Sequence, residues 1–111
     1  MNNTNEMSES DWKILKELKP LVLDRLCALV LQKVAQQCDS PSETNHQRFL
    51  KARSLIEAVN KDIGQIFDDM PRSNALERLR SMVAQELITE EELLRFSEET
   101  RSKVWWIENG P

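Results

Sequence analysis

Glycine and tyrosine are scarce in this chain of 111 residues, which contains two glycines and no tyrosine. Runs of β-branched residues, which strands favour, are also few. Leucine, glutamate, lysine, arginine and alanine are abundant instead, and all five favour helices. The composition therefore predicts an all-α protein, and the length is that of one domain.

Cysteine and histidine are scarce too, with two cysteines and one histidine. Cys27 and Cys38 lie about 16 Å apart along one predicted helix, which is too far for a disulfide between them. Cys27, Cys38 and His46 match no zinc-binding spacing, so we expect neither a metal nor a cofactor. Two free thiols, and the lack of an apolar segment with a cleavage site at the N-terminus, favour the cytoplasm.

The chain lacks an apolar run long enough to span a bilayer. Its most apolar stretch, residues 21–31, is too short and is interrupted by Asp24 and Arg25. A helix this apolar needs cover on most of its surface. It is either the central helix of a bundle or a helix with one face in a dimer interface.

The recognisable signatures of an enzyme are missing. The sequence shows no nucleophile with a base, no paired carboxylates beside an apolar pocket and no glycine-rich phosphate loop. His46 falls in the first turns of a predicted helix, where we interpret it as a surface residue. The sequence therefore predicts no catalytic residue, although an enzyme with an unrecognised carboxylate site stays a third hypothesis.

The strongest pattern present is an apolar seam between Ser40 and Met70, in which spacings of three and four residues alternate. Its members are Phe49, Ala52, Ile56, Val59, Ile63, Ile66 and Met70. This spacing predicts a long helix, about 41–69, that packs along another helix. Leu50, Leu55 and Phe67 widen the seam to the face of a helix covered by two neighbours, which come from this chain or from a second copy.

Start and stop signals divide the rest of the chain into helices. Capping boxes at Ser40–Glu43 and at Thr44–Gln47 give two possible starts for the long helix. Pro20 is expected to end or bend the helix that precedes residues 21–38. After Pro71, Ser73 begins a helix whose predicted core face is Leu76, Leu79, Val83 and Leu87, Thr89 begins a short one, and Ser97 begins the last.

These signals predict one architecture. Residues 1–7 form a disordered N-terminal tail, and residues 8–111 form a single helical domain. That domain is a compact helical bundle with two long antiparallel helices, about 21–38 and 41–69, and three or four shorter helices. The antiparallel arrangement follows from the very short connection between the two long helices.

Tryptophan is the least ordinary feature, since Trp105 and Trp106 are adjacent and point about 100° apart on a helix. Either one packs on the bundle, near Trp12, and the other is partly exposed, or the exposed one anchors a partner. The residues that we predict to contact a partner or a second subunit are Trp105, Trp106, Trp12, Leu23 and Val30.

The net charge of −4 disfavours non-specific binding to nucleic acids, but a local basic surface can exist within an acidic total. The candidate basic surface comprises Arg48, Arg53, Arg72, Arg78 and Arg80. The helix from Ser73 and the one from Thr89 superficially resemble a helix-turn-helix, yet the second begins with three glutamates where a DNA reader needs hydrogen-bond donors.

The sequence therefore favours a small cytoplasmic protein that is not an enzyme and serves as a protein–protein interaction or regulatory module. Its expected partner is a second copy of itself, in a homodimer, or another helical protein. Nucleic-acid or transcription-linked binding through the Arg and Lys face of residues 48–80 is the alternative.

Overall fold

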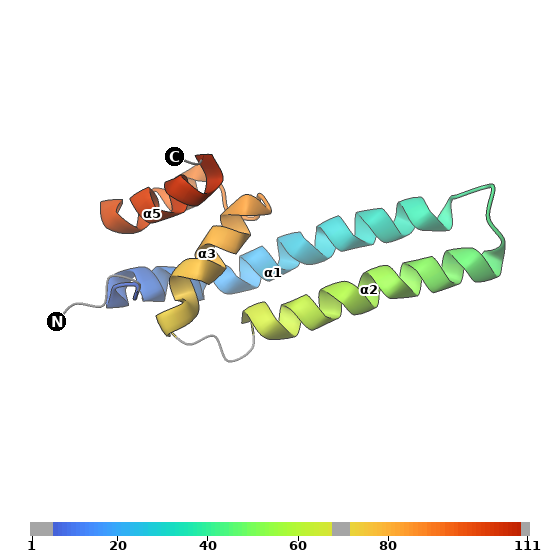
Figure 1. Ribbon diagram of the computed structural model, residues 1–111, viewed down its shortest axis with the longest axis horizontal. Coiled ribbons are helices and arrows are strands. Elements are labelled where there is room, and N and C mark those ends of the chain that lie inside the picture. Colours follow the sequence, from blue (N-terminus) through green and yellow to red (C-terminus); the bar gives the residue numbers. More distant parts are fainter. Residues whose placement is uncertain (1–5, 68–71, 110–111) are drawn as a thin grey trace. The chain divides into compact units, whose positions relative to one another are not determined.

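A computed structural model of the chain describes residues 6–67 and 72–109, with side chains for 6–64 and 72–104. The described residues are mostly helical and contain no strand, so the prediction of an all-α protein is confirmed. Figure 1 shows the elements in order: α1 (Glu9–Cys38), α2 (Asn45–Phe67), the short 3₁₀ helix η1 (Arg72–Asn74), α3 (Ala75–Ala84), α4 (Glu90–Leu93) and α5 (Glu98–Asn109).

The chain divides into two compact units, and the boundary falls inside α1. The first unit combines the chain up to Val22 with the chain from Asp69 onward, and the second unit is Leu23–Asp68. The first unit therefore contains the N-terminal part of α1 with α3, α4 and α5. The second contains the C-terminal part of α1 with α2.

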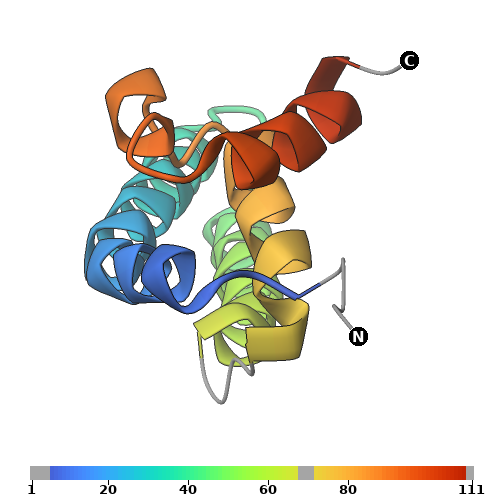
Figure 2. The ribbon, with the colours of Figure 1, turned by 90° about the vertical axis from the view of Figure 1, so that its left-hand side faces the viewer.

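The first unit has a well-filled apolar core. In it α5 packs on α3 (Figure 2). The predicted core face of α3 is confirmed, because Leu76, Leu79, Val83 and the following Leu87 are all buried. The other buried apolar side chains of this unit are Met7, Leu15, Leu18, Val22, Ala75, Met82, Phe96 and Val104.

The second unit is a helical hairpin, in which α2 runs antiparallel to the C-terminal part of α1 (Figures 1 and 2). The helix α2 begins at Asn45, after the later of the two predicted capping boxes. The backbone N–H of Gln47 donates to Thr44 Oγ1 at 3.1 Å, and the N–H of Thr44 donates to Gln47 Oε1 at 2.9 Å. This reciprocal capping box leaves residues 39–44 as the connection between the helices.

We expected Pro20 to end or bend a helix, and an end at this residue is wrong, because α1 continues through it. Leu15, Leu18 and Val22 are buried in one stripe that spans the proline. Burying this stripe offsets the loss of one backbone hydrogen bond at Pro20, whose own side chain is exposed.

Met7 is the last residue of the predicted N-terminal tail, and its side chain is only 2% exposed. The carbonyl of Met7 accepts a hydrogen bond of 2.7 Å from Arg72 Nε, and Glu6 lies 3.5 Å from the same nitrogen. Residues 1–5, like Met70 at the end of the predicted seam, lie outside the described residues.

Candidate functional site

One flank of the helical hairpin carries an open groove, which we call the apolar groove. Its volume is about 300 Å³. Among the described residues that line it, Asn60 is the only polar one, and none is charged. The lining comprises Cys27, Val30 and Leu31 from α1, with Ile56, Val59, Asn60 and Ile63 from α2.

Large aliphatic side chains project from the rim of the apolar groove into solvent. Leu31 is 64% exposed and Ile56 is 49% exposed. Phe49 is 62% exposed and, seven residues before Ile56, shares its face of α2. The hairpin therefore presents an apolar surface that the described part of the chain does not cover.

The apolar groove exists because the apolar stripe of α2 is wider than one helix can cover. Ala52, Val59 and Ile63 are half-buried on the hairpin, whereas Phe49 and Ile56 remain exposed. All five residues belong to the apolar seam that the spacing of three and four residues predicts. One neighbouring helix covers only the middle of such a stripe.

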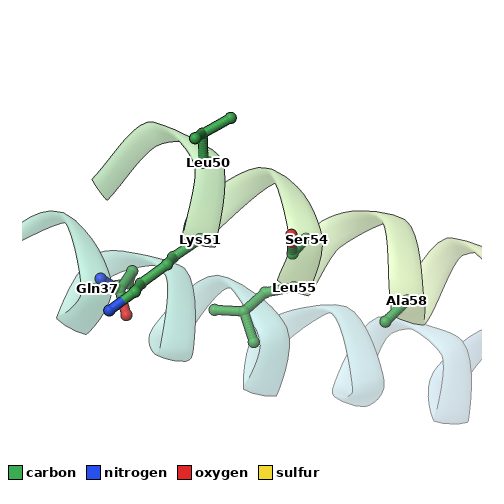
Figure 3. Close-up of a pocket in the computed structure, with 6 residues that line it drawn as sticks. All are labelled: Gln37, Leu50, Lys51, Ser54, Leu55 and Ala58. Carbon is green, nitrogen blue, oxygen red and sulfur yellow. The ribbon is translucent and has the colours of Figure 1, made fainter. Parts of the chain in front are cut away.

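The opposite flank of the hairpin carries a second groove of about 440 Å³, which is more polar (Figure 3). Figure 3 shows Leu55 directed from α2 toward α1, whereas Leu50 points away from α1. The lining comprises Gln37, Leu50, Lys51, Ser54, Leu55 and Ala58.

Glu43 secures the connecting end of this polar groove. One carboxylate oxygen accepts a hydrogen bond of 2.8 Å from Gln37 Nε2, and the other forms an ion pair with Lys51 Nζ. The contacts with Lys51, Gln37 and Ser40 lower the pKa of Glu43. Glu43 thus links Gln37 of α1 to Lys51 of α2, so these two groove residues hold the hairpin together.

The first unit contains a buried carboxylate, Asp11, which is 2% exposed. Its Oδ1 accepts from the Ser97 backbone N–H at 2.9 Å. Its Oδ2 accepts from the hydroxyls of Ser97 at 2.6 Å and Thr100 at 2.7 Å. Burial raises the pKa of Asp11, but these hydrogen bonds outweigh it, so the pKa lies below its usual value. Asp11 thus ties α1 to the N-terminus of α5.

The predicted partner contacts belong to both units. Val30 lines the apolar groove, and Leu23 is half-buried at the start of the second unit. Trp12 belongs to the first unit, where Lys16 Nζ lies 5.4 Å from the centre of its ring. Trp105 and Trp106 are in α5, but their side chains lie outside the described residues.

The arginines of the candidate basic surface are divided between the two units, and three of them have local partners. Arg48 donates to the Ser40 carbonyl at 2.6 Å and also to Asn45, and Arg53 pairs with Glu57 at 3.2 Å. In the first unit, Arg72 binds Met7 and Glu6. The other two arginines, Arg78 and Arg80, are half-buried in α3.

Three interface candidates were not selected from the sequence: Leu31, Phe49 and Ile56. Leu31 was part of the apolar run 21–31, and the other two were assigned to the helix seam. The signal that points to them is the excess width of both apolar faces. This width indicates that each face needs a further neighbour, but it does not identify which residues remain exposed to solvent.

The described lining of the two grooves contains no aspartate, glutamate or histidine. Among the described residues no three His, Cys, Asp or Glu side chains are grouped to hold a metal ion. No described helix combines the length and the apolar content needed to cross a membrane. Comparison with protein-family models, with curated proteins and with solved structures finds no match for this chain.

Proposed function

We propose that this protein is a non-enzymatic interaction module that binds a helix of its partner on the apolar groove. The observation behind the proposal is the exposure of Leu31 and Ile56, 64% and 49%, beside a groove with no charged residue in its described lining. Contiguous exposed apolar surface of this kind marks binding sites in soluble proteins.

The weak internal packing of the hairpin is a second support. Among its described side chains only Leu26 is buried, at 7% exposure. Ordering a residue costs about 1–2 kcal/mol of backbone conformational entropy, which one buried leucine cannot offset for two helices. A partner that covers the apolar groove adds the missing buried area.

The shape and chemistry of the groove favour an amphipathic helix as the ligand. Such a helix presents apolar side chains at intervals of three and four residues, and an open groove between two helices accepts them. We place this activity, and a regulatory role that acts through it, in the cytoplasm, because Cys27 and Cys38 are both free thiols.

Site-specific photo-crosslinking tests this proposal. A photoreactive amino acid replaces Leu31 in the full chain, which is expressed in the source cells and irradiated. The control replaces Leu94 in the first unit, which is also 64% exposed. We expect a protein product from position 31 that is absent from position 94 and is lost with Ile56→Asp.

Two results would contradict the proposal. One is a folded chain that gives no protein product from position 31. The other is the same set of products from positions 31 and 94, which would mean that crosslinking reflects exposure alone.

A further inference from the structure

We draw no further inference here: the strongest candidate, the apolar groove on one flank of the α1–α2 hairpin, belongs to the site already described, and nothing in the described part of the chain shows what covers it.

Discussion

Asp11 accepts three hydrogen bonds, two from Ser97 just before α5 and one from Thr100 in its first turn, and is the clearest single-residue contribution to the fold of the first unit. Because its pKa is lowered in the folded state, the stability it contributes is complete above the ordinary value of 3.8 and is lost as the pH falls through the folded pKa. Acid should therefore loosen the tie between α1 and α5.

Asp11→Asn should remove this acid-dependent contribution. We expect the free energy of unfolding to fall by about 1–3 kcal/mol near neutral pH, because the amide cannot accept all three hydrogen bonds. The difference from the unaltered chain should narrow as the pH falls below 3.8. Urea unfolding at a series of pH values measures it, with the exposed Glu9→Gln as a control. A difference that does not change with pH would contradict the assignment.

Glu86 has a φ of 61°, in the left-handed region, and follows Gln85, the C-cap of α3. The N–H of Leu87 donates to the Met82 carbonyl and that of Glu86 to the Val83 carbonyl, both at 2.9 Å. This pattern is a Schellman motif, whose left-handed position glycine occupies at the least cost.

Glu86→Gly should therefore stabilise the protein, by about 0.5–1 kcal/mol. Thermal unfolding followed by circular dichroism measures the change as a higher midpoint. The matched control is Ala84→Gly at the last residue of α3, where we expect a lower midpoint, because glycine weakens a right-handed helix. Destabilisation by both variants would show that residue 86 is not left-handed in solution.

At the scale of elements, Pro20 lies inside α1 without ending it. Replacement by Ala restores a backbone N–H that can donate to the Lys16 carbonyl, and it removes a ring that crowds the preceding turn. Pro20→Ala should stabilise α1 by about 1–3 kcal/mol. Urea unfolding measures the gain, and an unchanged or lower stability would indicate that the helix ends near residue 20 in solution.

Local signals predicted most elements, because capping and apolar spacing act within a few residues. The capping box at Thr89 forms, with hydrogen bonds of 2.9 and 3.1 Å to Glu92, and the box at Thr44 defines the start of α2. The helix does not end at Pro20 because burial of Leu15, Leu18 and Val22 outweighs the tendency of proline to end a helix.

The apolar groove could not be predicted at the level of residues. Periodicity shows that α2 has a broad apolar face, but the part left open depends on where α1 lies across it. That position is a tertiary property, and it separates exposed Ile56 from half-buried Val59 three residues later. Among the predicted contacts whose side chains the structure describes, Val30 is the one that lines the groove.

At the scale of the whole molecule, the two units differ in how far each supports itself. The first buries a substantial apolar core, whereas only Leu26 is buried among the described side chains of the second. The central claim is therefore that the hairpin completes its packing with a partner on the apolar groove. Without that partner, α2 should be less stable than α3.

Hydrogen exchange of the purified full chain tests this claim most directly. The account predicts that the amides of α2 between Phe49 and Ile63 exchange faster than those of α3 between Leu76 and Val83, because the hairpin lacks the cover that a partner provides. Equal protection of the two helices would show that the hairpin is stable without a partner and would contradict the claim.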